Sequence, residues 1–304
     1  MPAIGIDIGG SKIALAVTDR ADILHIEKYP FTHRDDPHGL TGFLADKIKR
    51  LCAQLSIDHA GVGTPGWVVD GIVREAVNLG IGEYDLQGHL RRQVPIPVYV
   101  ENDARTALLG EARCGTLSGS RNAMMVTLGT GIGGAFWLDG RLYRGSFGCA
   151  GEIGHVSTSP KGALCSCGKR GCLEKTVSAA ALVRRAAALA RRSDGPLHRL
   201  CNGQPLRVDG EMIFRAAAQG DPAVARLLDR YIDELAHPLL ETAYLLDLDA
   251  IAVGGGISAQ HDMLIDPLRR RFAASGTRCR IDAAVLGNHA GLVGAALLGQ
   301  EDMS

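Results

Sequence analysis

Residues 6–11 read Ile-Asp-Ile-Gly-Gly-Ser, and residues 127–132 read Thr-Leu-Gly-Thr-Gly-Ile. In both stretches a short apolar run ends in a glycine turn, and another apolar run follows. This pattern is typical of strands that are joined by tight hairpins. Because one such stretch lies in each half of the chain, the sequence predicts an internal repeat of a strand–turn–strand unit.

Each half of the chain continues with a similar series of predicted elements. In the first half we expect strands at 4–7, 13–18 and 23–29, a helix over 40–55, strands at 60–63 and 98–100, and a helix over 102–114. In the second half we expect strands at 124–128, 135–138, 141–143 and 250–253, and helices over 176–192, 222–246 and 290–298. The long helix over 222–246 is expected to kink at Pro238.

Two copies of a β-β-β-α-β unit resemble the architecture of the actin, hexokinase and Hsp70-type ATPases. The resemblance indicates an α/β protein with a duplicated actin/hexokinase-like (ribonuclease H-like) ATPase fold, in which two domains flank a cleft. We expect a small N-terminal domain over 1–118 and a larger C-terminal domain over 119–288 that carries the metal-binding loop described below. The last helix, within 289–304, is expected to pack back on the first domain.

The composition disfavours several classes of protein. The 304 residues are 46% hydrophobic and 22% charged, which is typical of a globular enzyme. The 33 Lys and Arg residues balance the 33 Asp and Glu residues, so no surplus of charge points to a nucleic acid partner. The sequence has no apolar run of membrane-spanning length and no leader-like start, so we expect a cytoplasmic protein without a membrane partner.

One imidazole and three thiols lie close together in the sequence, at His155, Cys165, Cys167 and Cys172. Three cysteines and one histidine are a ligand set for a closed, tetrahedral Zn²⁺ site, and four protein ligands leave no open position for catalysis. The alternative is that these cysteines are small buried hydrophobes. Disulfides are disfavoured because no signal peptide opens the chain. We therefore predict a structural zinc site.

Glycine clusters at 9–10, 129–134 and 254–256 each follow an apolar run. Residues 129–134 match G-x-G-x-x-G, but a β-hairpin pattern follows where a dinucleotide site requires a helix, so NAD binding is rejected. Residues 5–12 nearly spell a P-loop, but the order Gly-Ser-Lys and the strand that follows reject this interpretation too. We infer that the backbone N–H groups of two hairpins, with the hydroxyls of Ser11 and Thr130, hold the phosphates of one nucleotide. The alternative is that they are plain hairpin turns.

Two acidic residues at predicted strand ends are candidates for catalysis. Asp7 ends the first strand, where a carboxylate can orient the Mg²⁺ of a nucleotide, and the alternative is a turn-forming Asp. Asp103 follows the strand 98–100, at the edge of an α/β sheet where ligands commonly bind. If a phosphoryl group is transferred to a hydroxyl there, Asp103 is our candidate for the base that accepts the proton. The alternative is that Asn102 or Asp103 only caps the next helix.

Six motifs, read together, resemble the ROK family of bacterial sugar kinases and sugar-responsive repressors. They fall in the expected order along nearly the whole chain: Asp7-Ile-Gly-Gly-Ser-Lys12, Glu101-Asn-Asp-Ala104, Leu128-Gly-Thr-Gly-Ile-Gly-Gly134, Glu152-Ile-Gly-His155, Cys165-Ser-Cys-Gly-Lys-Arg-Gly-Cys-Leu-Glu174 and Gly254-Gly-Gly-Ile-Ser258. The His/Cys/Glu block is the most specific, because other actin-like ATPases share the glycine turns. Arg105 departs from the pattern, since the family often has Asn there.

The resemblance implies a role for each motif residue. Asp103 would be the general base for the sugar hydroxyl. The sugar would contact Gly66, Asn78, Asn102, Asp103, Glu152, His155 and Glu174, with His155 also a zinc ligand. ATP and its Mg²⁺ would contact Asp7, Gly9, Gly10, Ser11, Lys12, Gly129, Thr130, Gly131, Gly133, Gly134, Gly255 and Gly256. The implied ligands are a hexose as substrate, ATP, Mg²⁺ and a structural Zn²⁺, and we expect a homodimer.

The motifs look most like the branch of the family that converts glucose to glucose 6-phosphate in glycolysis. Kinases of the same family for N-acetylglucosamine, N-acetylmannosamine, fructose or mannose are the alternatives, and either ATP or polyphosphate is compatible as the donor. A sugar-sensing repressor is disfavoured because the first strand begins at Ala3 and leaves no room for a preceding DNA-binding region. A non-catalytic binding protein is disfavoured because Asp103 accompanies both glycine hairpins.

Overall fold

The computed structural model of the protein describes residues 2–301. The backbone forms two compact units, which we call the N-terminal unit and the central unit. The N-terminal unit comprises the chain up to Ser120, Ala135–Ala150 and the chain from Val285 onward, and the central unit comprises Arg121–Gly134 and Gly151–Ala284. The division expected from the sequence, 1–118 with 289–304 against 119–288, stays a prediction and differs in assigning 135–150 to the second domain.

The sheet of the N-terminal unit has five strands in the order β3-β2-β1-β4-β7. These are β3 (Asp22–Pro30), β2 (Lys12–Asp19), β1 (Ala3–Ile8), β4 (Ala60–Thr64) and β7 (Val98–Asn102). Neighbouring strands among β1, β2 and β3 are antiparallel, whereas β4 is parallel to both β1 and β7. The carboxyl ends of β1, β4 and β7 therefore meet at one edge of the sheet, which is the edge where open α/β sheets bind ligands.

One face of this sheet is covered by a helix with an apolar stripe. Apart from β10 and most of β9, which belong to the second sheet described below, the remaining elements of the unit are α1 (Pro37–Gln54), β5 (Trp67–Val69), β6 (Ile72–Glu75), η1 (Val77–Leu79), α2 (Leu86–Arg91), α3 (Asp103–Cys114), η5 (Gly287–His289) and α10 (Ala290–Glu301). Leu44 and Ile48 of α1 are fully buried in a core with Ile6 of β1 and Leu15 of β2. Burial of such side chains is the main favourable contribution to the stability of the unit.

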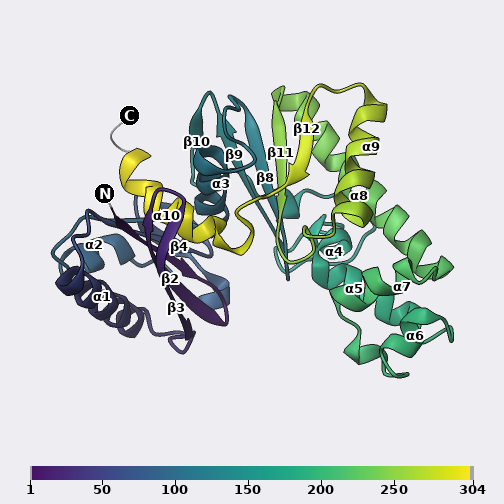
Figure 1. The fold of residues 1–304 in the computed structure, drawn as a ribbon, viewed down its shortest axis with the longest axis horizontal. Coiled ribbons are helices and arrows are strands. Elements are labelled where there is room, and N and C mark those ends of the chain that lie inside the picture. Colours follow the sequence, from purple (N-terminus) through teal and green to yellow (C-terminus); the bar gives the residue numbers. More distant parts are fainter. Residues whose placement is uncertain (1, 302–304) are drawn as a thin grey trace. The chain divides into compact units, whose positions relative to one another are not determined.

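The C-terminal helix α10 packs on the opposite face of the sheet, where Ala14 and Ala16 of β2 contact Leu292 (Figure 1). At some positions the backbone of the helix lies directly against the backbone of the strands. A Cβ atom on Gly5 of β1 would collide with the carbonyl group of Leu292, and one on Gly61 of β4 would collide with that of Ala295. A Cβ atom on Gly294 would likewise collide with the backbone of α3. Glycine is required at these positions because any side chain would separate α10 from the sheet or from α3.

The second sheet also has five strands, in the order β10-β9-β8-β11-β12. These are β10 (Arg141–Tyr143), β9 (Ile132–Leu138), β8 (Ala123–Leu128), β11 (Ala250–Gly254) and β12 (Arg280–Ala283). β10 is antiparallel to β9, whereas β11 is parallel to both β8 and β12. In both sheets the order along the chain is third, second, first, fourth and fifth strand, which confirms the predicted internal repeat.

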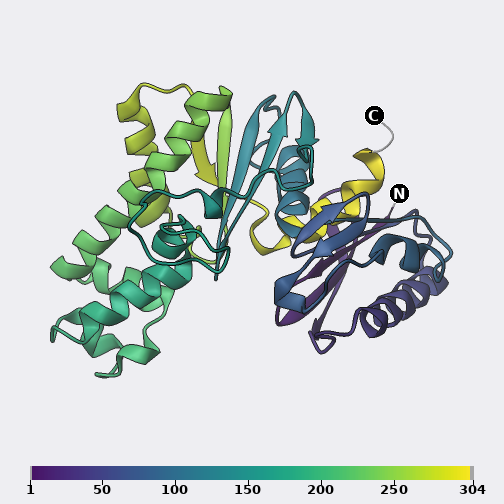
Figure 2. The ribbon, with the colours of Figure 1, turned by 180° about the vertical axis from the view of Figure 1, so that it is seen from behind.

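Besides β8, β11, β12 and the start of β9, the central unit consists mainly of helices. They are η2 (Ile153–His155), α4 (Glu174–Val177), α5 (Ala179–Ala190), α6 (Pro196–Leu200), η3 (Pro205–Arg207), α7 (Gly210–Ala218), α8 (Pro222–Leu246), the π-helical turn η4 (His261–Ile265) and α9 (Asp266–Ser275). The helices α5, α7 and α8 contact one another and form the green helical part in Figure 2. Within residues 2–301, no helix is both long enough and apolar enough to cross a membrane.

The central unit differs from the predicted elements in several places, and the helices α6, α7 and α9 were not predicted at all. The helix predicted over 176–192 is interrupted at Ser178, which ends α4 and caps α5 by accepting a hydrogen bond from Ala181 N–H at 3.1 Å. The sequence pattern does not predict β12, because four residues are too few for a recognisable alternation. The helix α8 continues through Pro238, as a single element over the predicted range.

Candidate active site and metal centre

The turn between β1 and β2 is a tight hairpin at the ligand edge of the first sheet. Gly9 N–H donates to the Lys12 carbonyl at 2.8 Å, and Gly10 and Ser11 are exposed at the tip. Asp7 lies in β1 next to this turn. Burial raises the pKa of Asp7, and the positive charge of Lys12 opposes the rise. The hairpin thus presents an exposed backbone tip and a hydroxyl beside a carboxyl group.

The junction between β7 and α3 holds Asn102 and Asp103 in a fixed arrangement. Asn102 is the N-cap of α3, and its Oδ1 accepts from the backbone N–H groups of Ala104 and Arg105 at 3.0 and 3.1 Å. Its Nδ2 donates to Asp103 Oδ1 at 3.0 Å, and Ala104 N–H donates to the same oxygen at 2.8 Å. Asn102 therefore caps the helix, as one alternative predicted, while Asp103 lies in the first turn at the carboxyl end of β7. The partial positive charge of the helix N-terminus favours an ionised carboxylate there.

Gly66 joins this junction from the loop after β4. Its φ is +95°, and a Cβ atom would collide with the backbone of β6, so only glycine fits. The Gly66 carbonyl accepts a hydrogen bond from Asn102 Nδ2 at 3.0 Å. Asn78 is exposed in η1, two residues after Ala76, whose Cα lies against Gly66. The structure thus brings Gly66, Asn102 and Asp103 into direct contact and places Asn78 on an adjacent loop.

In the central unit, the hairpin between β8 and β9 is bound to Glu174, the first residue of α4. Gly129 N–H donates to the Gly131 carbonyl at 3.0 Å and closes the turn. Ile132 N–H donates to Glu174 Oε2 at 3.2 Å, and a Cβ atom on Gly131 would collide with the same oxygen. A residue predicted to bind the sugar is therefore in contact with a turn predicted to bind phosphate.

The other predicted glycines surround the same hairpin. A Cβ atom on Gly255, whose φ is +96°, would collide with the backbone of Leu128, just before the turn. A Cβ atom on Gly134 would collide with the carbonyl of Gly151, which precedes the predicted sugar ligand Glu152. Of the remaining predicted nucleotide residues, Thr130 and Gly256 are exposed on these loops, and Gly133 is half-buried in β9. Close backbone packing thus gathers the glycine turns at the carboxyl ends of β8 and β11.

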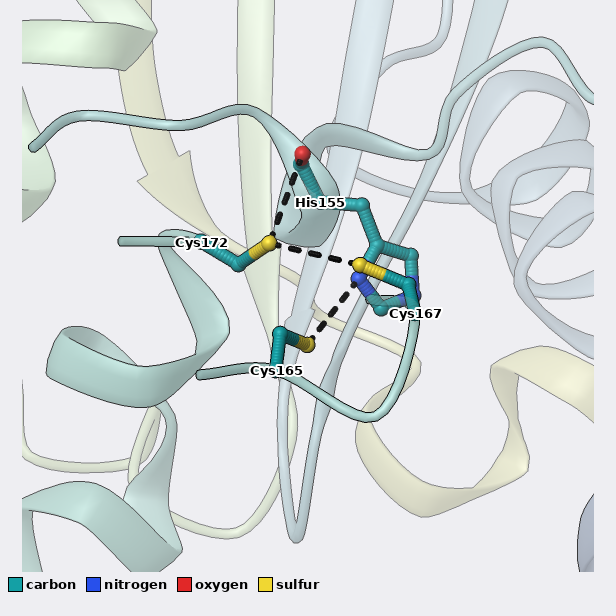
Figure 3. Close-up of side chains that lie close together, drawn as sticks. All are labelled: His155, Cys165, Cys167 and Cys172. Carbon is teal, nitrogen blue, oxygen red and sulfur yellow. Dashed lines mark hydrogen bonds between the residues drawn. The ribbon is translucent and has the colours of Figure 1, made fainter. Parts of the chain in front are cut away.

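The four predicted metal ligands converge on one point of the central unit (Figure 3). Each of His155, Cys165, Cys167 and Cys172 offers a ligand atom within 4.8 Å of the other three. Cys165 Sγ is 3.7 Å from His155 Nδ1, and Cys167 Sγ is 3.5 Å from Cys172 Sγ. Sulfurs bound tetrahedrally at about 2.3 Å from zinc lie roughly 3.8 Å apart, so these donors have the type and spacing that zinc requires.

A compact turn holds the cysteines together. Isolated bridges join Ser157 to Cys172 and Leu164 to Arg170, and all three cysteines are free thiols. Burial opposes ionisation of Cys165, but hydrogen bonds from Cys167 outweigh it and lower its pKa to about 6. Burial and the neighbouring thiols raise the pKa of Cys172 to about 12. The surroundings of Cys165 therefore favour the thiolate, which is the form that binds metal.

His155 faces two groups with its two ring nitrogens. Its Nδ1 faces Cys165, and its Nε2 is 3.9 Å from Glu152 Oε2. If Nδ1 binds a metal, the ring proton lies on Nε2 and faces a carboxylate, which is the usual arrangement around metal-binding histidines. The imidazole thus connects the thiol cluster to a predicted sugar ligand.

Two buried charges beside Asp103 were not assigned any role from the sequence. Glu101 and Arg105 are each 3% exposed and form an ion pair of 2.8 Å, and Glu101 also pairs with Arg144 at 2.6 Å. The signal in the sequence is a Glu and an Arg four residues apart, in a segment whose following residues are mostly apolar or small. Such a pair is expected to meet when the chain turns into a helix between them.

Comparison with known proteins gives a consistent result. The ROK family model matches residues 3–302. A glucokinase of Streptomyces coelicolor is 38% identical over 98% of this chain and 97% of its own, and an N-acetylmannosamine kinase of Haemophilus influenzae is 28% identical over 97% and 94%. The crystal structure of a ROK family glucokinase from Streptomyces griseus, in complex with glucose and AMPPNP, is similar with a TM-score of 0.84. Its sequence is 35% identical, and the match covers 98% of this chain and 99% of that chain. These likenesses confirm the actin/hexokinase-like fold, and the chain belongs to the ROK family.

Proposed function

We propose that this protein is a glucokinase, which transfers the γ-phosphoryl group of ATP to the 6-hydroxyl group of glucose. The observation that carries the proposal is the likeness over the whole chain to a ROK family kinase with glucose and AMPPNP bound. The junction of β7 and α3 supports it, because a carboxylate lies at the carboxyl end of the parallel strands of the first sheet, as the reaction requires.

Asp103 is the proposed general base. The sugar oxygen forms a bond to the γ-phosphorus while the bond from that phosphorus to the leaving oxygen of ADP breaks, and the hydroxyl proton moves to the Asp103 carboxylate. Two hydrogen bonds to Asp103 Oδ1, from Asn102 Nδ2 at 3.0 Å and Ala104 N–H at 2.8 Å, orient the carboxylate before the substrate binds. Such orientation lowers the entropy that must be lost on the way to the transition state.

The sugar is proposed to be bound by groups that exchange hydrogen bonds with hydroxyls. Carboxylates accept, amides do both, and an imidazole with a proton on Nε2 donates. The proposed ligands are Gly66, Asn78, Asn102, Asp103, Glu152, His155 and Glu174.

ATP is proposed to be bound by the two glycine hairpins and the cluster at Gly255 and Gly256. The exposed tips of both hairpins carry a hydroxyl, from Ser11 and Thr130, beside backbone that a bulky side chain does not cover. Asp7 would face the Mg²⁺ that accompanies ATP, and this ion would neutralise charge on the phosphates. Proximity of the dication would also favour the ionised form of Asp7, against the effect of burial.

We further propose that His155, Cys165, Cys167 and Cys172 hold a structural zinc ion. Support comes from the convergence of four donors of suitable chemistry within 4.8 Å. The ion would supply four bonds that fix the turn, and Glu174 follows the last ligand by two residues. A rigid turn would therefore hold Glu174 against the β8–β9 hairpin.

We also expect the protein to work in the cytoplasm and as a homodimer. All eight cysteines are free thiols in the structure, in agreement with a reducing compartment.

The decisive experiment is a phosphorylation assay of the purified protein over a panel of sugars. The panel contains glucose, mannose, fructose, N-acetylglucosamine and N-acetylmannosamine, each with ATP or polyphosphate as the donor. We expect the highest kcat/KM for glucose with ATP. Preference for an N-acetylated sugar would change the assigned substrate, and failure to phosphorylate any sugar would refute the kinase proposal.

A further inference from the structure

Arg105, in the first turn of α3, is a cation that is shut off from solvent. Its exposed fraction is 3%, although arginine is almost never so buried unless it is paired. Its Nη1 donates to Glu101 Oε1 at 2.8 Å and to the Val68 carbonyl at 3.3 Å, and its Nη2 donates to the Gly148 carbonyl. One guanidinium therefore joins α3 to β5, to β7 and to the loop 144–150, all within the N-terminal unit.

The loop is confined at the same point. Gly148 has a φ of +69°, and a Cβ atom there would collide with the Val69 side chain and lie 2.9 Å from the Val68 carbonyl. The backbone of Gly148 therefore lies directly on β5. By contrast, its neighbour Phe147 is 84% exposed. The loop is anchored to the body of the unit at Gly148.

The need to neutralise the charge of Glu101 does not explain why Arg105 is buried. Arg144 Nε already donates to Glu101 Oε2 at 2.6 Å, and the Arg144 side chain is 45% exposed, so this second cation needs no burial. Moreover, the buried Nε of Arg105 has no hydrogen-bond partner in the described part of the chain. A buried cation with an unpaired donor is unfavourable for folding, and such exceptions to normal packing are concentrated at functional sites.

We propose that Arg105 is a positioning residue of the phosphoryl-transfer site. It holds the loop 144–150, which leads into Glu152, against the turn that carries Asn102 and Asp103. It acts through these backbone segments and not by touching the substrate. We call the set of contacts that Arg105 makes with Glu101, Val68 and Gly148 the clamp. The proposal rests on the proposed kinase function, because the clamp is proposed to serve the phosphoryl-transfer step.

Arginine is suited to this role because its two terminal nitrogens donate in different directions from one rigid plane. Lysine has a single nitrogen, so Arg105→Lys keeps the charge beside Glu101 and is expected to lose the hydrogen bond to Gly148. Displacement of reacting groups by an ångström can lower a rate about 100-fold. We therefore expect kcat per folded molecule to fall about 10- to 100-fold, with the KM for ATP within about twofold.

Arg144→Gln is the matched control. It removes the other cation from Glu101 and leaves the contact between Arg105 and Gly148 in place. Because the buried Glu101 carboxylate keeps its ion pair with Arg105 and Arg144 itself is half-exposed, kcat is expected to stay within about threefold of the unmodified protein.

Gly148→Ala tests the same contact from the loop side, and it also serves if Arg105→Lys fails to fold. The added methyl group would push the loop off β5 and away from Arg105. Gly140→Ala is its control, because Gly140 has a similar φ of +73° but open space around its Cβ position. Both changes impose the same backbone strain, so only a displaced loop explains a loss of kcat in Gly148→Ala alone.

Hydrogen exchange of the backbone amides separates positioning from stability. We expect exchange over 146–150 to accelerate in Arg105→Lys and Gly148→Ala, and to stay unchanged in Gly140→Ala. Normal kcat per folded molecule in Arg105→Lys and Gly148→Ala, or an equal loss in Arg144→Gln, would overturn the proposal. If the unmodified protein phosphorylates no sugar, the proposed function fails instead, and unchanged loop exchange in Arg105→Lys would still refute the clamp.

Discussion

Ile132 N–H donates a hydrogen bond to Glu174 Oε2 at 3.2 Å. A carboxylate at the start of α4 is thereby bound to the backbone of the β8–β9 hairpin. The same carboxylate follows the last cysteine of the thiol cluster by two residues. The cluster, the proposed sugar ligand and the proposed phosphate turn are therefore mechanically linked, and a change at one of them is expected to be felt at the others.

The contact between Glu174 and Ile132 predicts different effects of two substitutions. In Glu174→Gln an amide oxygen can still accept from Ile132 N–H, so the hairpin should hold and only the KM for the sugar should rise. In Glu174→Ala the acceptor is lost, and the KM for ATP should rise as well. A hydrogen bond to a charged group contributes about 1.5–3 kcal/mol, so we expect increases of roughly 10- to 100-fold. Steady-state kinetics with each substrate varied checks this, and equal ATP KM values in the two variants would contradict it.

Asp103→Asn should remove turnover and leave folding intact, because Asn102 and not Asp103 provides the helix cap. An amide can hydrogen-bond the sugar hydroxyl but cannot take its proton, so kcat should fall on the order of 10²- to 10⁴-fold. Sugar affinity measured by calorimetry should change little. Asp209→Asn, at the N-cap of α7, is a control that makes the same replacement away from the site. A near-normal kcat in Asp103→Asn would refute the base assignment.

Asn102→Asp should shift the pH dependence of turnover. Aspartate is as good a helix cap as asparagine, so the cap of α3 should be kept, whereas Asn102→Ala should lose about 1 kcal/mol of unfolding free energy with the cap. Both variants lack the Nδ2 donor and lose the hydrogen bond to the Gly66 carbonyl. A second carboxylate beside Asp103 raises the pKa of that residue, because two like charges disfavour ionisation. A base must be deprotonated to act, so the acid limb of the kcat profile should move to higher pH. If the acid limb of the kcat profile lies at the same pH in Asn102→Asp and in the unmodified protein, Asp103 is not the titrating group.

The thiol cluster should carry one zinc ion per chain. Elemental analysis of the purified protein checks this, and protein without zinc would rule it out. Cys167→Ser should lose the metal, melt at a lower temperature and bind the sugar more weakly, because the turn that precedes Glu174 would no longer be fixed. Cys52→Ser is the control, since that half-buried thiol lies in α1 of the other unit. Equal zinc content in Cys167→Ser and the unmodified protein would refute the ligand assignment.

Features that depend on neighbours in the sequence could be predicted from the sequence. The strands beside the glycine turns follow from backbone chemistry, and the thiol cluster converges because its four ligands lie within one short segment. Asn102 shows the limit of such reasoning. An asparagine at this position could cap the helix α3, bind the sugar, or orient Asp103, and the residue type alone does not distinguish these roles. The structure settles the cap, and the catalytic role of Asp103 stays a prediction, as do the other assigned ligands.

Contacts between distant segments could not be predicted from the sequence. The hydrogen bond from Ile132 to Glu174 and the anchoring of Gly148 by Arg105 depend on the paths of long loops, which no local pattern encodes. The strand β12 is recognisable only because β11 pairs with it. The break between α4 and α5 is set by one serine hydroxyl that competes for a backbone N–H group.

The direct packing of α10 on β1 and β4 also determines when the N-terminal unit can finish folding during translation. Ribosomes add about 5–20 residues per second, so roughly 10 to 30 s pass between the synthesis of Ser120 and that of Ala290. During this interval one face of the first sheet lacks its helix, and that face exposes the backbone of Gly5 and Gly61 beside the apolar side chains of Ala14 and Ala16. The part of the protein that is translated first is therefore completed last. Until α10 leaves the ribosome, the nascent chain must keep the uncovered face of this sheet from binding other polypeptides.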